Sequence, residues 1–298
     1  MSRVSRGTPG ADAYLDLQNQ ARRAKRPTQE LHQLYVLEGF LARLVASDVR
    51  ESFVLKGGVL LAAFDSRRPT KDVDLAALDI ANDTATVLDL IRTVLAVTLP
   101  ADDGIEFDAD AVTAAVIRGQ DEYSGVRVQA DARLARALLP FHIDVNVGDP
   151  IWPAPTTVTV PRLRGGEPIV LAGYPIHMVH AEKVVTAVQR GDTNTRWRDF
   201  GDIWTLSRQH SVDADDLAHA IAEVARHRDA TLHSLAEILD GFAAIGQARW
   251  ATWRRSSNSD SLPEQFAPVL DAVIDFADPV LTGTAAHRAW NPGSRTWA

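Results

Sequence analysis

The segment Lys71-Asp72-Val73-Asp74-Leu75 contains two aspartates separated by one apolar residue. If this segment is a β-strand, Val73 and Leu75 point into the core and both carboxylates point to the opposite face. The carboxylates would lie roughly 7 Å apart along the strand. There they can hold a hard divalent cation such as Mg²⁺, which prefers oxygen ligands and shares them with substrate phosphates. The alternative is a pair of surface aspartates on an edge strand.

A strand, two glycines and a helix precede these aspartates. The apolar run Ser52–Leu55 predicts a buried strand, which leads through Lys56 into Gly57 and Gly58. Residues Val59–Phe64 then begin a helix. This order brings backbone amides and a helix N-terminus against a phosphate. A glycine pair alone is not specific, since any tight turn can use it.

The loop between this helix and the aspartates carries three cations, Arg67, Arg68 and Lys71. They could balance the charge of Asp72 and Asp74. They could also bind the triphosphate or the nucleic acid that a metal at the aspartates would serve.

These motifs together resemble a known superfamily. A glycine pair followed by Asp-x-Asp on a strand is similar to the signature of the polymerase-β-like nucleotidyltransferases. That superfamily carries a third carboxylate on a later strand, and Asp144 in the segment Phe141–Val147 matches it. The closer resemblance is to the AbiEii-type nucleotidyltransferase toxins. It rests on Leu55–Leu61, Arg68–Leu75, Ile143–Val145, Gly148–Pro150, Glu182-Lys183 and Arg198–Trp204.

The resemblance implies a fold and a function. The fold would be α/β (α+β): a mixed-sheet, polymerase-β-like nucleotidyltransferase domain followed by an α-helical domain. Such toxins belong to toxin–antitoxin or phage-defence pairs and include mycobacterial members that modify tRNA. The implied reaction is Mg²⁺-dependent transfer of a nucleoside monophosphate from an NTP to an RNA acceptor, with the tRNA 3′ end as the expected site. The outcome would be a block on translation, which a partner antitoxin relieves.

The resemblance also implies roles for particular residues. Asp72, Asp74 and Asp144 would bind the metal, and Asp144 could instead act as the base. Lys183 would contact the triphosphate, and Asp202 would orient Lys183 or the acceptor, with Asp199 as a further candidate. The nucleotide itself would be bound by Lys56, Gly57, Gly58, Arg68 and Lys71.

Composition limits the remaining possibilities. A chain of 298 residues accommodates one large or two ordinary domains. It has no cysteine, which excludes disulfides, thiolate metal sites and a cysteine nucleophile. No secretory h-region or apolar run of about 18 residues is present, so we expect a cytoplasmic protein. The net charge of −8 is unlike that of a generic nucleic-acid binder, so contact with RNA would be confined to a local basic face.

The remaining pattern predicts the order of elements. Residues 1–11 are expected to be a flexible tail and Pro161–Gly173 a loop, which gives a nucleotidyltransferase domain at 1–165 and a helical domain at 166–298. His142 shares a face with Asp144 and is interpreted as a hydrogen-bonded residue at the sheet edge. The expected helices are 12–26, 28–45, 81–97, 175–190, 195–209, 214–226, 232–247 and 263–276; the later strands are 112–117, 126–130, 141–147 and 156–160, with a turn at 119–125 and a weakly ordered tail at 282–298.

Two other functions share parts of this pattern. An antibiotic nucleotidyltransferase would have the same core and modify a small molecule, but the helical region and the basic loop favour RNA. A non-catalytic subunit could keep the fold for nucleotide sensing, but a degenerate copy often loses one of the acids. The helix end Arg22–Arg26 is either a solvated terminus or a further RNA-facing patch.

Overall fold

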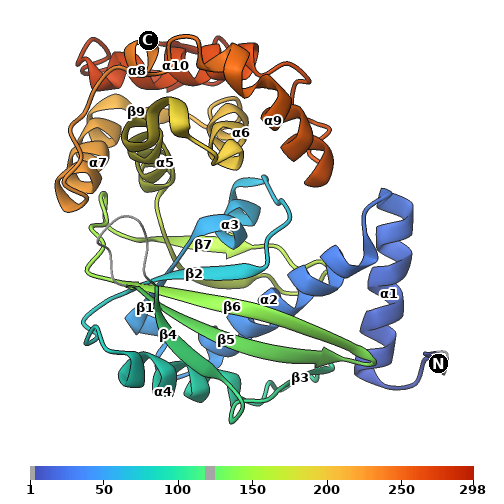
Figure 1. Cartoon of the computed structure of the whole chain (residues 1–298). Helices are drawn as coiled ribbons and strands as arrows, with labels where there is room; N and C mark the ends of the chain where they lie inside the picture. The colour runs from blue at the N-terminus through green and yellow to red at the C-terminus, as the bar shows by residue number, and fades with distance from the viewer. Residues whose placement is uncertain (1–3, 118–124) are drawn as a thin grey trace. The chain divides into compact units, whose positions relative to one another are not determined.

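The structure is a computed structural model that describes residues 4–117 and 125–298 (Figure 1). The expected turn at 119–125 therefore lies, except for Gly125, outside the described residues. The chain forms two compact units. The first comprises Met1–Asp149 and Thr156–Gly173, and the second comprises Pro150–Pro155 and Tyr174–Ala298.

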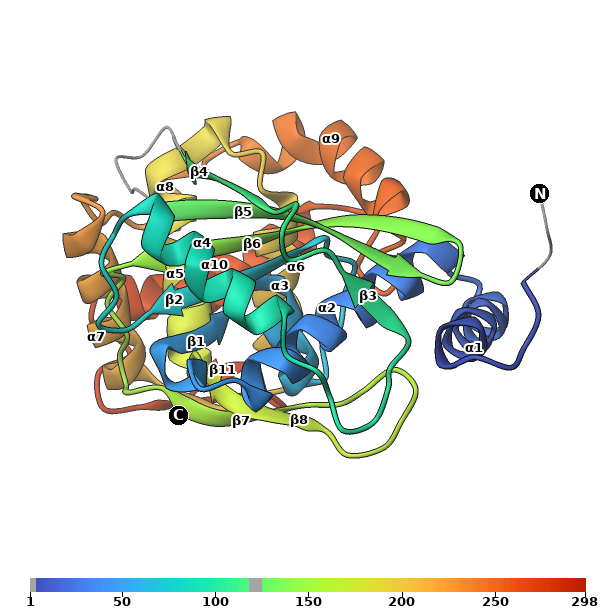
Figure 2. The same cartoon turned by 90° about the horizontal axis from the view of Figure 1, so that it is seen from below.

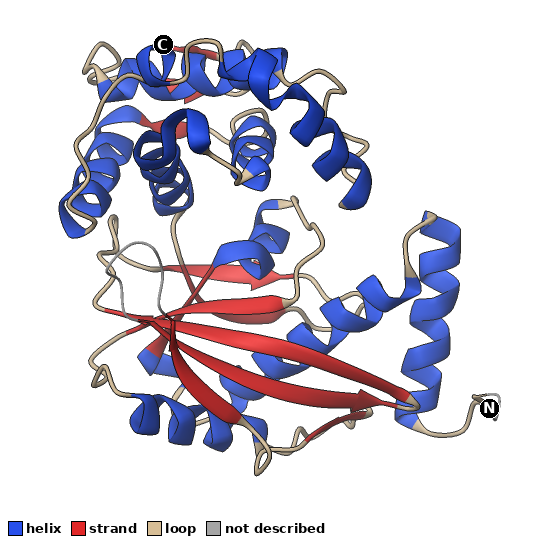
Figure 3. Cartoon of the chain, in the orientation of Figure 1, coloured by secondary structure: helices blue, strands red, loops and turns tan. Residues whose placement is uncertain are grey.

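The first unit is built on a mixed sheet, as the sequence predicts (Figure 3). Among the described residues this sheet has eight strands. The strand order is β3-β5-β6-β2-β1-β8-β7, and β4 also pairs with β5. The pairs β2–β6 and β1–β8 are parallel, and the others are antiparallel. The strands are β1 Phe53–Lys56, β2 Asp72–Ala77, β3 Ile105–Phe107, β4 Thr113–Ile117, β5 Gly125–Leu134, β6 Ala137–Val147, β7 Thr156–Val160 and β8 Ile169–Gly173.

Strand β2 shows the predicted alternation of side chains. Val73 and Leu75 are fully buried, whereas Asp72 and Asp74 are half-buried on the opposite face. A strand places successive side chains on opposite faces of the sheet, so one segment can fill the core and present two acids. The prediction of a core-packed strand that carries both carboxylates on one face is confirmed.

Helices α2 and α4 cover one face of this sheet (Figure 2). Helix α2 is buried along most of its length and contacts β6 and β8. Helix α1 starts earlier than expected, because the Thr8 hydroxyl accepts a hydrogen bond from the Ala11 amide at 3.3 Å and caps it. Residues 9–11 therefore belong to a helix and not to a flexible tail. The helices are α1 Pro9–Ala24, α2 Thr28–Ala46, α3 Gly57–Leu60 and α4 Thr84–Leu95, with 3₁₀ turns at Arg50–Ser52 and Leu61–Phe64.

The second unit is mainly helical and also contains a small antiparallel sheet. Its strands are β9 Val212–Asp213, β10 Ala289–Asn291 and β11 Thr296–Trp297. Among the described residues, no helix combines the length and the apolar character needed to cross a membrane. The helices are α5 Ile176–Arg190, α6 Trp197–Leu206, α7 Ala214–His227, α8 Leu235–Ile238, α9 Phe242–Ser256 and α10 Ala267–Leu281, with a 3₁₀ turn at Gly191–Thr193.

The expected weakly ordered tail at 282–298 is wrong. Trp290 and Trp297 pack against Phe276 of α10, with ring centroids 5.0 and 5.5 Å away. The Trp297 indole also donates a hydrogen bond to the Phe276 carbonyl at 3.1 Å. These two aromatic side chains bury enough apolar surface to fix a segment that otherwise has a loop-like composition.

Two other expected segments differ. The expected loop Pro161–Gly173 contains β8, which pairs with β1 through Leu55 and Gly173, so the first unit extends to Gly173 and not to residue 165. The expected helix 232–247 is interrupted at Gly241, whose φ of +72° lies in the left-handed region and separates α8 from α9. Glycine adopts this conformation without steric strain.

Candidate active site

Three aspartates converge on the sheet of the first unit. Asp74 on β2 is the register partner of Asp144 on β6, and Asp72 is the register partner of His142. The three side chains Asp72, Asp74 and Asp144 each offer a carboxylate oxygen, and these oxygens all lie within 4.8 Å of one another. The cluster arises because β2 and β6 are adjacent and parallel, which brings residues far apart in sequence into one row.

His142 differs from its prediction. Strand β6 lies between β5 and β2, inside the sheet and not at its edge. The Nδ1 atom of His142 is buried and has no hydrogen-bond partner among the described residues. The expected position at the sheet edge is therefore wrong, and Nδ1 does not supply the expected hydrogen bond within the part of the chain that the structure describes.

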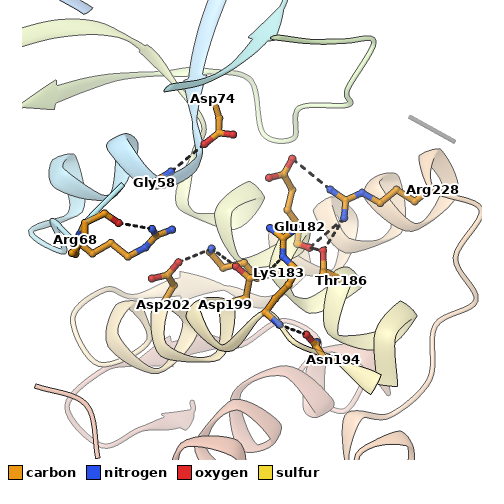
Figure 4. Close-up of polar contacts among 12 residues, drawn as sticks. Gly58, Arg68, Asp74, Glu182, Lys183, Thr186, Asn194, Asp199, Asp202 and Arg228 are labelled. Carbon is orange, nitrogen blue, oxygen red and sulfur yellow. Dashed lines mark hydrogen bonds and ion pairs between the residues drawn. The ribbon is translucent and has the colours of Figure 1, made fainter. Parts of the chain in front are cut away.

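The two glycines make room for Asp74. Gly57 has a φ of +67°, and a Cβ atom at this position would lie 1.8 Å from Asp74 Oδ2. The Gly58 amide donates a long hydrogen bond of 3.4 Å to the same oxygen (Figure 4). Helix α3 is one turn long and continues into the 3₁₀ turn Leu61–Phe64, so phosphate binding by its N-terminus stays a prediction. The Gly58 amide is directed at the aspartate in this structure.

The three cations of the loop before β2 have different roles. Arg67 donates hydrogen bonds to the buried Glu38 carboxylate and to the Pro161 carbonyl. Glu38 also accepts from the Leu163 amide, so Arg67 joins this loop to the β7–β8 connection. The possible role of Arg67 in binding RNA or triphosphate is therefore replaced by a structural one.

Arg68 and Lys71 remain candidates for phosphate binding. The Arg68 guanidinium lies beside the glycine turn, because a Cβ atom at Gly58 would lie 3.2 Å from Arg68 Nη1. It also donates to the Pro69 carbonyl at 3.3 Å. Lys71, immediately before Asp72, is exposed.

Two charged residues near the carboxylates, Asp149 and Arg127, were not predicted to have a role there. Lys56 forms an ion pair with Asp149, with 2.5 Å between Nζ and Oδ2. Asp149 was interpreted as a turn residue, although it lies in a segment that carries the family resemblance. Arg127 on β5 binds Asp144 with two parallel hydrogen bonds, Nε to Oδ1 at 2.7 Å and Nη2 to Oδ2 at 2.6 Å. A predicted strand alone does not reveal the partner of Arg127, because the pairing of strands is not known from sequence.

In the second unit, Lys183 is held between two aspartates (Figure 4). Its Nζ lies 2.8 Å from Asp202 Oδ2 and 3.1 Å from Asp199 Oδ1. Lys183 is on α5, and the two aspartates are three residues apart on α6, which places them on the same helix face. The predicted shared face is confirmed, and the role of Asp202 in orienting Lys183 or the acceptor stays a prediction.

Asp199 accepts hydrogen bonds from two cations, Lys183 and Arg196. Its second oxygen accepts a hydrogen bond from Arg196 Nε at 2.7 Å. Burial alone raises the pKa of Asp199, but Lys183 and Arg196 outweigh it and lower the pKa below its usual value. Asp199 is therefore ionised and, together with Asp202, holds Lys183 in place.

Comparison with known proteins identifies the family. Residues 39–275 match the family described as nucleotidyl transferase AbiEii toxin, type IV TA system. The chain belongs to the AbiEii nucleotidyltransferase toxin family. Two solved structures from Helicobacter pylori, JHP933 and a protein described as a nucleotidyltransferase, are each 14% identical with a TM-score of 0.47. The similarity covers 84% of this chain, 94% of JHP933 and 97% of the other chain. No curated protein matches this chain.

The carboxylates of this AbiEii protein fit a divalent cation. Asp72, Asp74 and Asp144 supply only oxygen ligands, which is the donor type that Mg²⁺ takes. Neighbouring groups orient two of them: Thr70 donates a hydrogen bond to Asp72, and Arg127 binds Asp144. Orientation by surrounding hydrogen bonds is typical of groups that bind a metal.

Proposed function

We propose that this AbiEii nucleotidyltransferase transfers a nucleoside monophosphate from an NTP to an RNA acceptor, with the tRNA 3′ end as the principal site. The observation that carries the proposal is the convergence of Asp72, Asp74 and Asp144 on one face of the sheet. Three carboxylates in so small a space repel one another, and a divalent cation relieves this repulsion. The family assignment supplies nucleotidyl transfer as the reaction that such a site supports.

In the proposed reaction, the acceptor hydroxyl oxygen bonds to the α-phosphorus of the NTP. The bond from that phosphorus to the bridging oxygen breaks, and pyrophosphate leaves. Mg²⁺ bound by the carboxylates would neutralise charge on the triphosphate. Asp72 and Asp74 would be ligands, and Asp144 would be either a third ligand or the base that takes the hydroxyl proton.

Cationic side chains would bind the phosphates. Lys183 would contact the triphosphate as a point charge, and Asp202 would orient it. Arg68 and Lys71 lie beside the glycine turn and Asp72, where they can meet triphosphate or RNA phosphate. Lys56 contributes charge near the glycines, although its Nζ is paired with Asp149.

RNA is favoured over a small acceptor because the first unit, although acidic, exposes cations beside Asp72 and at the end of α1. Besides Lys71, the end of α1 exposes Arg22, Arg23 and Lys25. The membership of the type IV toxin family supports a partner antitoxin. The cytoplasm is the proposed location, because NTP and tRNA are found there.

The test is incubation of the purified protein with each α-labelled NTP, Mg²⁺ and total RNA. We expect one NTP to label an RNA of tRNA size, and periodate oxidation of the 3′ end to prevent it. Expression without an antitoxin should arrest growth, whereas the Asp74→Asn variant should not. Efficient labelling of aminoglycosides with no labelling of RNA and harmless expression would replace this proposal with an antibiotic-modifying enzyme.

A further inference from the structure

Four charged residues form one row across four adjacent strands. Lys56 on β1 pairs in register with Asp74 on β2, Asp74 with Asp144 on β6, and Asp144 with Arg127 on β5. Register partners project from the same face of a sheet. The row therefore has a cation at each end and two carboxylates between them.

The two cations of this row have different partners. Lys56 Nζ makes an ion pair with Asp149, outside the carboxylate cluster. Arg127 instead uses two nitrogens to bind both oxygens of Asp144, at 2.7 and 2.6 Å. A bidentate guanidinium–carboxylate pair is among the stronger charge-assisted contacts and fixes the plane of the carboxylate. Arg127 thus directly contacts one of the proposed metal ligands.

This contact conflicts with a metal at the same carboxylate. A divalent cation that binds Asp72, Asp74 and Asp144 must approach a carboxylate whose two oxygens already accept hydrogen bonds from a positive group. The two cations repel each other at short range. We propose that Arg127 and the divalent cation compete for Asp144, so that Arg127 stabilises the carboxylate cluster when no metal is bound and lowers the affinity for metal.

This role differs from that of an ordinary surface ion pair. Exposed pairs contribute little, because water screens them, and the Arg127 side chain is 41% exposed. The Asp144 side chain is only 10% exposed, however, and two further carboxylates adjoin it. Removal of the guanidinium would leave a nearly buried anion beside two others, which is the situation that favours a bound cation.

The inference rests on the proposed metal site but not on the proposed acceptor, because its test needs neither NTP nor RNA. Mn²⁺ binding is measured on the free protein by electron paramagnetic resonance and calorimetry. The Arg127→Lys variant keeps the charge but loses the two parallel hydrogen bonds. We expect it to bind Mn²⁺ roughly tenfold more tightly, a difference of about 1.4 kcal/mol. In EDTA its melting temperature should fall, and Mn²⁺ should raise that temperature more than in the wild type.

Two controls make the test specific. Arg133→Gln removes an exposed cation from the same strand, β5, at a position that pairs with Leu138 and not with Asp144, and we expect a change in Mn²⁺ affinity below about threefold, because solvent screens an exposed charge. In an Asp144→Asn background, Arg127→Lys should have no further effect, since the competing contact is already lost.

The outcomes separate the two proposals. If Asp74→Asn abolishes Mn²⁺ binding but Arg127→Lys leaves it unchanged or weaker, the competition is refuted and the metal site stands. If Asp74→Asn leaves Mn²⁺ binding unchanged, the metal site falls and the competition falls with it. If the protein labels no RNA but still shows the effect of Arg127→Lys on Mn²⁺ binding, only the proposal of an RNA acceptor is overturned.

Discussion

The Asp74 carboxylate fills the space that a side chain on Gly57 would occupy. A Cβ atom on Gly57 would lie 1.8 Å from Asp74 Oδ2, closer than any non-bonded contact allows. The backbone of Gly57 also has a φ of +67°, which side chains disfavour. The glycine turn therefore shapes the position of a proposed metal ligand as well as the path of the chain.

Gly57→Ala should displace Asp74 and reduce nucleotidyl transfer at least about a hundredfold, the equivalent of about 2.7 kcal/mol. Gly166→Ala is the matched control, because Gly166 also has a positive φ but no atom lies within 4 Å of its Cβ position. The control should lose about 1–2 kcal/mol of stability and keep its activity. Label transfer and urea unfolding of both variants measure this. Equal activity in the two variants would show that only backbone strain matters.

Asp74→Asn keeps the shape of the side chain and removes a charged ligand. We expect transfer to fall by two or more orders of magnitude, because metal binding contributes several kcal/mol to the transition state. In EDTA the variant should be as stable as the wild type or more stable, since one of three mutually repelling carboxylates is neutral. The control is Asp131→Asn, which changes an exposed carboxylate on β5. Its activity and stability should be close to those of the wild type. Normal transfer by Asp74→Asn would eliminate the carboxylate site.

Lys183→Ala should affect both stability and activity. It leaves Asp199 and Asp202 without their shared cation, and both are nearly buried. Breaking such a pair costs about 3–5 kcal/mol. Lys183→Arg keeps the charge, so its free energy of unfolding should be close to that of the wild type. Its nucleotidyl transfer should be at least about tenfold slower, because the head group has a different shape. Urea unfolding and kcat/KM separate the effects; an active Lys183→Arg variant would limit Lys183 to a structural role.

Arg68 and Lys71 should contribute to RNA binding. Replacement of each by glutamine should raise KM for RNA and flatten the log–log dependence on salt by about 0.7–0.9 for each lost phosphate contact. The control is Arg133→Gln, which removes an exposed cation on β5. It should leave the salt slope unchanged. Arg67→Gln should instead lower stability, because it leaves the buried Glu38 without its cation. An unchanged salt slope in the Arg68 and Lys71 variants would place RNA contact elsewhere.

His180 on α5 predicts a pH dependence of stability. It is fully buried, neither ring nitrogen has a hydrogen-bond partner among the described residues, and burial lowers its pKa from 6.5 to about 3. Between these values the unfolded chain binds a proton that the folded protein does not. The contribution of neutral His180 to the free energy of unfolding is therefore full above pH 6.5. It is lost as pH falls, by about 1.4 kcal/mol per pH unit.

The matched variants are His180→Leu and His233→Leu, the latter at an exposed position. Unfolding free energies between pH 7.5 and 5 should show a smaller slope only for His180→Leu. Equal slopes in the wild type and His180→Leu would contradict the assignment.

The sequence predicted the local features of the fold more fully than the pairing of strands and of charged side chains. The alternation around Val73 and Leu75 is a local property, and it correctly gave a strand with both acids on one face. Which strands lie side by side depends on contacts across the whole sheet, so the partners Arg127–Asp144 and Lys56–Asp149 were not predicted. Arg67 illustrates the same limit: its partner Glu38 lies on a helix far away in sequence, and nothing in the loop itself indicates the contact.

The chain passes between its two units more than once, and this path affects folding during synthesis and the fragments that a cut produces. The chain leaves the first unit at Asp149, returns to it at Thr156 and leaves again after Gly173. Strand β1, which carries Lys56 and leads into the glycine turn, pairs with β8 at the very end of that path. On the ribosome, both aspartates of β2 emerge well before β6 and β8 exist to complete their sheet. A nascent chain interrupted before Gly173 therefore carries an unfinished sheet. A cut after Gly173 leaves the first unit whole but separates Pro150–Pro155 from the rest of the second, so no single cut in the polypeptide releases the second unit whole.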